Sequence, residues 1–411
     1  MIDNKMLMEK ALGIHSPWYI KDVSFDAEAK RLDIYIDFEK GARFEYEDLK
    51  EGIKGDFPVH DTVEKQWRHL NFFQHECYLH ARIPRIDAGE GRIRIITPPW
   101  AGLSNGFTML FEALVLQLAS SMPVHTAAAI IGESDYKIWN ILERYVDQAL
   151  EQVDLSRMTA VGMDETAMRR GHDYITLFVD MNGRRTVHVA EGRGSETVRE
   201  FATALAGHGG DPGAITDVSC DMSPAFIKGV SETLPNAQVT FDKFHLLKVI
   251  NEAVDQVRRE ETFTEPLLRN SRYALLKNAS NLTSAQREKL EELSLPKFRL
   301  KSIRALHIRE NFQEIYKART AKQFAILLQK WYFWATHSRL EPVKKAAQTI
   351  KRHWDGVLRW KQSQISNGIL EGLNSLVQAA KAKARGFKTF RHFRIIVFLL
   401  TGKLDFSLVG R

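Results

Sequence analysis

The order of strand-like and helix-like runs after Met158 is the feature that most constrains how this 411-residue chain can fold. Three β-rich runs come first, and Asn182 with Gly183 supplies hairpin turn chemistry between the second and third. Helix-like and strand-like runs then alternate. The predicted strands are 159–164, 173–180, 185–190, 214–220 and 238–241, and the predicted helices are 195–206, 224–233 and 244 to about 261. An antiparallel meander that leads into alternating helices and strands predicts an α/β domain.

This strand order is typical of a ribonuclease-H-like domain, in which the first and fourth strands are neighbours. Asp164 ends the first predicted strand and Asp221 follows the fourth, so both are expected at one end of the sheet. Glu371 lies on the last predicted helix, 365–384, and shares one helical face with Asn367 and Asn374. We predict that this face points back at the two aspartates and that the two asparagines support the site.

Taken singly these carboxylates are weak signals, because an acid at a strand end usually caps a turn and a helical glutamate is usually solvated. Together, and in this order, they predict a site for two Mg²⁺ or Mn²⁺ ions, which prefer carboxylate oxygens. Two ions roughly 3.5–4 Å apart can activate a water or a 3′-hydroxyl and stabilise the charge that develops during phosphoryl transfer. We predict that Asp164 bridges the ions and that Asp221 and Glu371 each complete one ion's shell.

Five ordered motifs resemble those of the DDE transposases of the ISL insertion-sequence family, the ISL-three group. The motifs are 162–165 with 170–174 (Gly-Met-Asp-Glu and Arg-Gly-His-Asp-Tyr), 221–224 (Asp-Met-Ser-Pro), 241–245 (Phe-Asp-Lys-Phe-His), 331–339 (Trp-Tyr-Phe-Trp-Ala-Thr-His-Ser-Arg) and 367–374. The resemblance covers about residues 55–405. It implies a ribonuclease-H-like catalytic domain, dependence on Mg²⁺, and cleavage and strand transfer at the terminal inverted repeats of a bacterial mobile element.

The rest of the chain is expected to form modules around this catalytic domain. Residues 101–150 contain three helix-like runs, with Ser134 or Asp135 as a suitable N-cap for the third. They resemble a helix-turn-helix, with a plain helical linker bundle as the alternative. The predicted modules are a small β-rich domain (1–100), the helix-turn-helix (101–150), the first part of the ribonuclease-H-like core (151–261), an α-helical insertion (262–355), and a catalytic helix with a basic tail (356–411).

Cysteine usage argues against a zinc site. The chain has only Cys77 and Cys220, so it offers neither a disulfide framework nor a CxxC pair. Members of the family commonly carry a Cys-rich zinc-binding module before the helix-turn-helix, whereas residues 44–98 contain Cys77 alone. Residues 67–70 and 78–82 still resemble that module's framework, so we expect its β-rich fold to persist and structural zinc to be unlikely.

Basic residues concentrate in the C-terminal part. Residues 243–411 carry 33 Lys and Arg against 14 Asp and Glu, and residues 1–242 carry 25 against 37, within a net charge of +7. Such a surface favours a polyanion, because phosphate contacts release condensed counterions; a solvated surface without nucleic acid is the alternative. We predict that a homo-oligomer binds double-stranded DNA, both transposon ends and target. Contacts with the DNA backbone are expected from Lys381, Lys383, Arg385, Lys388, Arg391 and Arg394.

The sequence has no apolar run of the roughly 18 residues that a membrane span needs, and no signal-peptide pattern follows Met1. We therefore expect no membrane association. The expected location is the bacterial cytoplasm, on the nucleoid when DNA is bound.

Three further groups have both a functional and a structural interpretation. Asp242 and His245 adjoin the predicted site and could support it or contact DNA, although helix capping by Asp242 is a sufficient reason for its presence. His172 could contact a phosphate or simply flank a hairpin. The aromatic cluster 331–337 could stack on an unpaired base, but packing in the core of the insertion is favoured.

The sequence therefore predicts a DDE transposase. It contains no Walker loop, dinucleotide-binding GxGxxG, nucleophile elbow or HExxH motif. Two alternatives stay open: a nuclease of the same fold that cleaves without joining, and a DNA-binding regulator that has no catalytic activity and binds DNA regardless of Mg²⁺.

Overall fold

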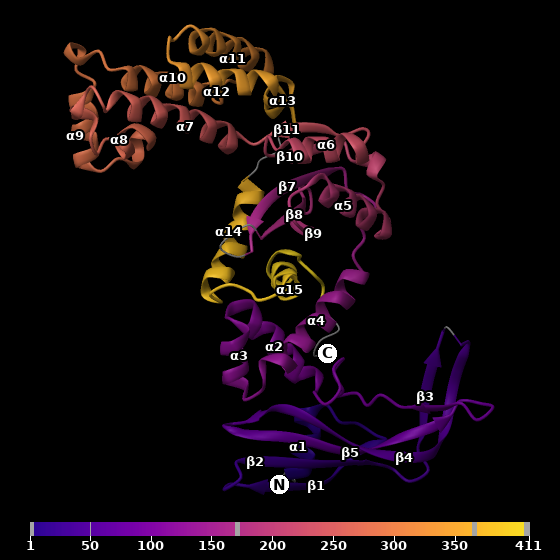
Figure 1. The fold of residues 1–411 in the computed structure, drawn as a ribbon. Helices are drawn as coiled ribbons and strands as arrows, with labels where there is room; N and C mark the ends of the chain where they lie inside the picture. The colour runs from indigo at the N-terminus through magenta and orange to yellow at the C-terminus, as the bar shows by residue number, and fades with distance from the viewer. Residues whose placement is uncertain (1–3, 50, 169–172, 364–367, 407–411) are drawn as a thin grey trace. The chain divides into compact units, whose positions relative to one another are not determined.

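The computed structural model describes residues 4–49, 51–168, 173–363 and 368–406 (Figure 1). The chain divides into two compact units. One unit comprises Met1–Val153 with Ala379–Arg411, and the other comprises Asp154–Gln378. Among the described residues, no helix is long and apolar enough to cross a membrane.

The N-terminal part of the first unit is a twisted sheet. Its elements are α1 (Asn4–Leu12), β1 (Trp18–Asp26), β2 (Arg31–Phe38), β3 (Arg43–Asp48), β4 (Ile53–Phe72), β5 (His75–Asp87) and β6 (Ile93–Ile95). The strand order is β1-β2-β5-β4-β3, and β6 pairs with β5. Strands β2 and β5 alternate buried apolar and more exposed residues over much of their length, which is typical of strands with one face on a core. The prediction of a β-rich N-terminal region is confirmed.

Three helices follow this sheet. They are α2 (Met109–Ser121), α3 (Val124–Ile131) and α4 (Asp135–Glu151). Thr108 and Ser134 cap α2 and α4, because each side-chain oxygen accepts a hydrogen bond from a backbone N–H of the first turn. The buried Glu112 is satisfied by the backbone N–H groups of Leu103 and Ser104 and by the Tyr145 hydroxyl. Helix α4 is strongly amphipathic, which explains why its position was predictable from sequence.

A further helix, α15 (Phe390–Thr401), packs against α4 and α2 in the same unit. The sequence predicts a basic tail after a last helix at 365–384, and this prediction was wrong because a further helix follows. The cause is that α15 is apolar on its buried face: Phe393, Ile396 and Val397 are all at most 5% exposed. A short basic run at its start masked that pattern.

The second unit contains a five-stranded mixed sheet. Its strands are β7 (Ala160–Ala167), β8 (Tyr174–Asp180), β9 (Arg185–Glu191), β10 (Asp217–Cys220) and β11 (Gln238–Phe241), in the order β11-β10-β7-β8-β9. Strands β7, β8 and β9 pair antiparallel, whereas β10 pairs parallel with both β7 and β11. Helices α5 (Ser195–Gly207) and α6 (Pro224–Thr233) pack against each other beside the sheet (Figure 1). The prediction of a mixed α/β domain is confirmed.

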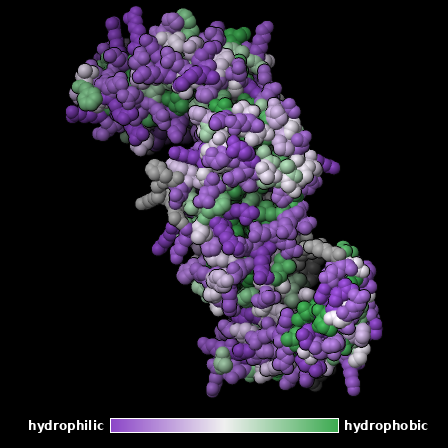
Figure 2. All heavy atoms as spheres, turned by 45° about the vertical axis from the view of Figure 1, so that its right-hand side comes forward, coloured by the Kyte–Doolittle hydropathy of each residue, from purple (hydrophilic) through white to green (hydrophobic). Residues whose placement is uncertain are grey.

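A helical region follows β11. Its helices are α7 (Lys243–Glu261), α8 (Arg272–Leu276), α9 (Ser284–Leu293), α10 (Lys301–Ile315), α11 (Ala321–Thr336), α12 (Glu341–Arg352) and α13 (Trp354–Ser363). Short 3₁₀ turns occur in this region at Pro266–Leu268, Ala279–Asn281 and Pro296–Phe298. Another, at Pro212–Ala214, precedes β10. These helices share one apolar core that extends to Phe241, and hydrophilic side chains cover most of their visible outer face (Figure 2).

Helix α14 (Gly368–Lys383) returns to the sheet at β7. Gly162 on β7 permits this close approach, because a Cβ there would stand 2.6 Å from Met181 Sδ and 2.9 Å from the Leu370 methyl carbons. Leu370 packs in a small apolar cluster with Ala160, Val179 and Met181. Since Leu370 directly precedes Glu371, this packing fixes the start of α14 beside β7.

The substitution Gly162→Ala is therefore expected to lower the free energy of unfolding by about 1–3 kcal/mol through overpacking. Gly372→Ala on α14 is the matched control, because a Cβ at Gly372 would meet no atom within 4 Å. Alanine is the better helix former, so this control is expected to be neutral or to stabilise by up to about 1 kcal/mol. Denaturant titration followed by circular dichroism measures both, and equal stabilities for the two variants would contradict the close packing of α14.

Candidate active site

Three aspartates lie within or directly after three neighbouring strands of the sheet, β7, β10 and β11. β10 pairs with β7 up to Ser219 opposite Gly162, and Asp221 follows directly after the end of β10, on the strand next to the one that carries Asp164. Asp242 comes directly after β11, and its backbone N–H donates to the Cys220 carbonyl at 3.1 Å. Asp164 lies within β7 rather than at its end, because β7 extends to Ala167 through its pairing with β8.

Asp164 is held by two hydrogen bonds. Its Oδ1 accepts from the Glu165 backbone N–H at 2.9 Å, and its Oδ2 accepts from Asn374 Nδ2 at 2.5 Å. Burial raises the pKa of the Asp164 carboxyl, and the neighbouring Asp242 charge adds to this rise, while the bond from Asn374 opposes it. The carboxylate is thus oriented by the protein in a position where negative charge is costly.

Two amides fix α14 on β7. Asn374 contacts both Asp164 and the Thr166 hydroxyl, and one turn later Gln378 Nε2 donates to Thr166 Oγ1 at 2.9 Å. Residues four apart share a helical face, so both amides point at the same strand. Glu371 lies one turn before Asn374 and is exposed. The pKa of Glu371 is raised by partial desolvation and by the charges of Asp242 and Asp164, which places these carboxylates near one another.

Asp242 and His245 form a pair at the start of α7. Asp242 caps the helix, since its Oδ1 accepts from the Phe244 backbone N–H at 2.9 Å, and its Oδ2 lies 3.0 Å from His245 Nδ1. This bond raises the pKa of His245, and the charges of Asp221 and Asp164 add to the rise. Asp242 therefore caps the helix and also lies in the site, so the two interpretations of this residue are compatible.

Glu165 is a further acidic residue near the site, and it was not among the predicted site residues. Burial raises the pKa of its carboxyl, followed by the charge of Asp221. Its position directly after Asp164 was visible in the sequence, but strand alternation would have sent it to the opposite face. Only the assembled sheet places it near Asp221.

The site is strongly acidic. Asp164, Glu165, Asp221, Asp242 and Glu371 interact electrostatically with one another or with His245, the one basic group that recurs among these interactions. Within the described residues, no three His, Cys, Asp or Glu side chains are close enough together to form a ready ligand shell for a metal ion. The chemistry of the group nevertheless fits divalent cations. The pKa values of Asp164, Glu165 and Glu371 are raised because negative charge is unfavourable there, and a bound cation would stabilise these carboxylate oxygens.

If Asp164 holds a metal ion, as the sequence predicts, removing the Asn374 amide is expected to slow DNA cleavage by about 10–100-fold, the usual cost of losing a group that orients a metal ligand. In Asn374→Ala, partial recovery at high Mg²⁺ is expected, because a misoriented Asp164 weakens ion binding. The exposed Ser375→Ala on the same helix is the control. Cleavage rates measured across a Mg²⁺ titration test this, and an unchanged Mg²⁺ dependence in Asn374→Ala would argue against an orienting role.

Several sequence predictions fall elsewhere. Asn367 and residues 170–172, including His172, lie outside the described residues. Of the basic run, Arg391 pairs with Glu143 and Arg394 Nη1 lies 3.1 Å from Asp147, both on α4. These two charges are engaged within the protein, whereas Lys383, Arg385 and Lys388 are exposed.

The aromatic cluster is divided between core and surface. Trp331 is 1% exposed and its indole N–H donates to the Ile308 carbonyl at 2.9 Å. Phe333 is 63% exposed and stacks on His337 at 4.0 Å between ring centroids. Core packing therefore accounts for Trp331, as favoured from sequence, but not for Phe333.

Comparison with known proteins addresses the family. Residues 161–397, more than half of the chain, match the transposase domain model of the ISL3 group. The chain belongs to the ISL3 family of DDE transposases. The predicted resemblance is thereby confirmed. Residues 96–146 match the helix-turn-helix domain of transposase family ISL3, so α2–α4 form that domain and not a plain linker bundle.

Two relatives extend the ISL3 assignment along the chain. The chain is 26% identical over 347 residues to the transposase for insertion sequence element IS1001 of Bordetella parapertussis, which covers 82% of this chain and 84% of the relative. It is 27% identical over 363 residues to the transposase for insertion sequence element IS1557 of Mycobacterium tuberculosis, which covers 79% of each. Each relative therefore aligns with this chain over most of its own length.

The prediction about zinc was wrong. Residues 56–87 match the zinc-finger of transposase IS204/IS1001/IS1096/IS1165, which points to structural zinc in this part of ISL3 proteins. The prediction counted cysteines only, although zinc also binds His nitrogen and carboxylate oxygen.

The matched stretch spans most of β4 and β5. Burial raises the pKa of Cys77 to about 11 and lowers the pKa of His69 to about 4, while His80 Nε2 lies 2.5 Å from Asp33. In the part of the chain that the structure describes, these side chains do not form a group of three that could hold a metal ion. No step proposed below depends on zinc.

Proposed function

We propose that this ISL3-family chain cleaves DNA at the terminal inverted repeats of an insertion sequence and joins the freed 3′ ends to target DNA. The proposal is supported by the positions of Asp164, Asp221 and Asp242 within or directly after three neighbouring strands, and by the charge interactions of Glu371 on α14 with Asp242 and Asp164. The names of the IS1001 and IS1557 relatives agree with this proposal.

We further propose that the second unit has a ribonuclease-H-like fold. Its support is the strand order β11-β10-β7-β8-β9, with three antiparallel strands followed by two parallel ones. The helical region α8–α13 then stands as an insertion between β11 and α14, close to the predicted 262–355. We keep the module boundaries predicted from the sequence as part of this proposal.

The chemistry assigned to the site is phosphoryl transfer. Two Mg²⁺ or Mn²⁺ ions would activate the attacking oxygen and stabilise the leaving oxygen. Asp164, Asp221 and Glu371 are the residues proposed to hold them, with Asp164 shared. Asn374 keeps the Asp164 carboxylate turned toward the site through its 2.5 Å bond.

His245 is proposed to hold a proton at the edge of this site. Its Nδ1 faces Asp242, so its other ring nitrogen is left to donate to a phosphate oxygen. A raised pKa keeps the ring charged to higher pH, where a cation beside the scissile phosphate favours DNA binding.

The first unit is proposed to read the terminal repeat through α2–α4, with α4 as the recognition helix. Lys381, Lys383, Arg385 and Lys388 are proposed to contact the DNA backbone. Joining two element ends requires two catalytic sites, so we propose a homo-oligomer on paired ends, acting on nucleoid DNA in the cytoplasm.

Incubation of the full chain with Mg²⁺ and labelled DNA carrying the element's own ends tests this function. The proposal expects 3′-end cleavage followed by joined products. Cleavage without joining would instead identify the nuclease alternative, and binding without any cleavage would identify the regulator.

A further inference from the structure

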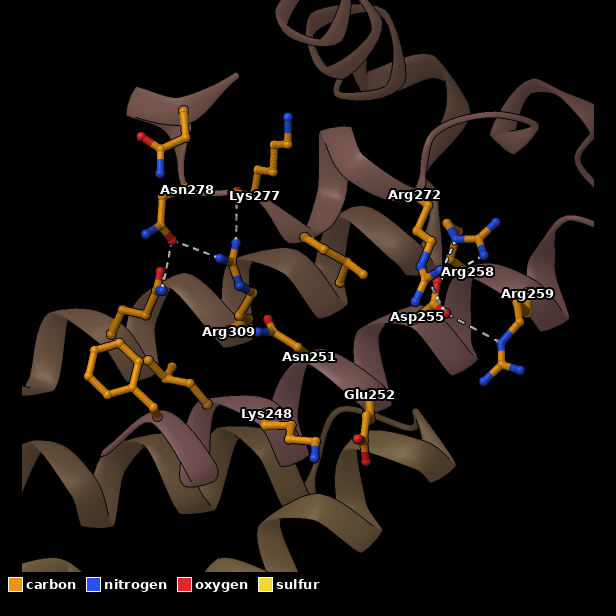
Figure 3. Close-up of a pocket in the computed structure, with 15 residues that line it drawn as sticks. Lys248, Asn251, Glu252, Asp255, Arg258, Arg259, Arg272, Lys277, Asn278 and Arg309 are labelled. Atoms are coloured by element: carbon orange, nitrogen blue, oxygen red, sulfur yellow. Dashed lines mark hydrogen bonds and ion pairs between the residues drawn. The ribbon is translucent and has the colours of Figure 1, made fainter. Parts of the chain in front are cut away.

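A large basic pocket lies in the helical region, outside the carboxylate site. Its volume is about 850 Å³, within the range of roughly 300–1,000 Å³ that ligand pockets have. Six of its lining residues are Lys or Arg and two are Asp or Glu. The pocket therefore has a clear excess of positive charge. In Figure 3 three arginines gather around Asp255, and Arg309 lies with Lys277 and Asn278, while Lys248 lies apart from both groups.

The first group places three guanidinium groups on one carboxylate. Arg258 Nη2 lies 2.8 Å from Asp255 Oδ1, while Arg259 Nε and Arg272 Nε each lie 3.6 Å from Asp255 Oδ2. Asp255 is 9% exposed, and its ion pairs hold the three guanidinium groups close together. One negative charge cannot neutralise three positive ones, so this group contributes to the excess of positive charge in the pocket.

The second group centres on a buried arginine. Arg309 is 2% exposed, and its two Nη atoms donate to neutral groups: the Lys277 carbonyl at 3.4 Å and Asn278 Oδ1 at 2.9 Å. Among the described residues its Nε has no hydrogen-bond acceptor. A buried guanidinium with neutral partners and an unused N–H is costly, and an anionic ligand would remove that cost.

Helix α7 connects this pocket to the active site. The helix begins at the Asp242 cap and carries His245 and Lys248 in its first two turns and Asp255 two turns later. Phe244, between Asp242 and His245 in sequence, already lines the pocket and is 55% exposed. At about 1.5 Å rise per residue, the distance from Asp242 to Arg258 is about 24 Å, or about seven steps of 3.4 Å along a DNA strand.

We propose that this pocket binds backbone phosphates of the DNA strand that leaves the active site along α7. The proposal rests on the proposed function only in that DNA is the substrate. Guanidinium groups suit this ligand because they bind phosphate oxygens through paired N–H donors. The pocket thus gives the insertion a role in holding DNA several nucleotides from the cleaved bond.

The test measures equilibrium binding of the full chain to a duplex that carries the element's own end and flank, in EDTA, at a series of salt concentrations. The variant is Arg272→Gln with Lys277→Gln, because both residues line the pocket and neither is buried. The control, Lys322→Gln with Lys330→Gln, removes two exposed charges of α11 that do not line it. The pocket variant is expected to bind about tenfold more weakly and to lose about 2 from the slope of log affinity against log salt, while the control changes little.

An unchanged slope in the pocket variant, or an equal loss in the control, would overturn the proposal. Thermal shifts with inorganic phosphate and with ATP separate the possible sources of phosphate: stabilisation that only the pocket variant loses, with DNA binding intact, would assign the pocket to a free anion and overturn the DNA assignment. Because binding in EDTA requires no catalysis, a protein that fails to cleave DNA could still pass this test. A protein that cleaves and joins normally could equally fail it.

Discussion

Replacing Glu371 by Gln is expected to reduce DNA cleavage and joining by about 10²–10³-fold, the scale on which loss of one electrostatic stabiliser slows other enzymes. The side chain keeps its shape but loses the charge that a divalent cation needs. Asp164→Asn and Asp221→Asn are expected to match it. The assay follows 3′-end cleavage and joined products on DNA carrying the element's ends.

The control for this series is Glu200→Gln, an exposed glutamate of α5 in the same unit. It is expected to cleave and join at the rate of the unaltered protein. The carboxylate variants should still bind DNA in EDTA, since removing negative charge does not weaken attraction to phosphates. Normal strand transfer by Glu371→Gln or by Asp221→Asn would refute the assignment of these residues.

Truncating Trp331 to Ala is expected to lower the free energy of unfolding by about 3–5 kcal/mol, as for other fully buried aromatic side chains. The ring is 1% exposed and lies 4.7 Å from Phe312 between ring centroids. Its removal also takes away the hydrogen bond that the indole N–H donates to the Ile308 carbonyl. Denaturant titration followed by circular dichroism measures the loss.

Trp334→Ala supplies the comparison, because this neighbouring ring is 38% exposed and its loss should cost about 1 kcal/mol or less. The pair separates the two interpretations of the aromatic cluster. If Trp331→Ala left stability unchanged but abolished DNA cleavage, stacking on an unpaired base would be favoured over core packing.

Local patterns in the sequence predicted many elements closely. The predicted ranges 224–233 and 238–241 coincide with α6 and β11. These segments have a clear period of apolar residues or strong strand formers, and their ends carry turn or capping residues such as Ser223 and Asp242. Elements of this kind are defined by contacts within a few residues.

The site was only partly predictable for a different reason. Asp164 and Asn374 meet across 210 positions of the chain, and no local period encodes such a contact. The same holds for Glu165, whose place near Asp221 depends on the pairing of β7 with β10. The sequence predicted that Arg391 contacts the DNA backbone as part of a basic run, yet packing of α15 on α4 pairs it with Glu143.

The order of most elements, the family resemblance and the choice of three candidate carboxylates followed from the sequence alone. Tertiary packing was needed to show which groups surround those carboxylates, how closely α14 approaches Gly162, and that six basic residues line one pocket. The difference arises because propensity, capping and amphipathic period act over a turn or a strand, whereas burial and electrostatic shifts depend on groups brought together from distant parts of the chain.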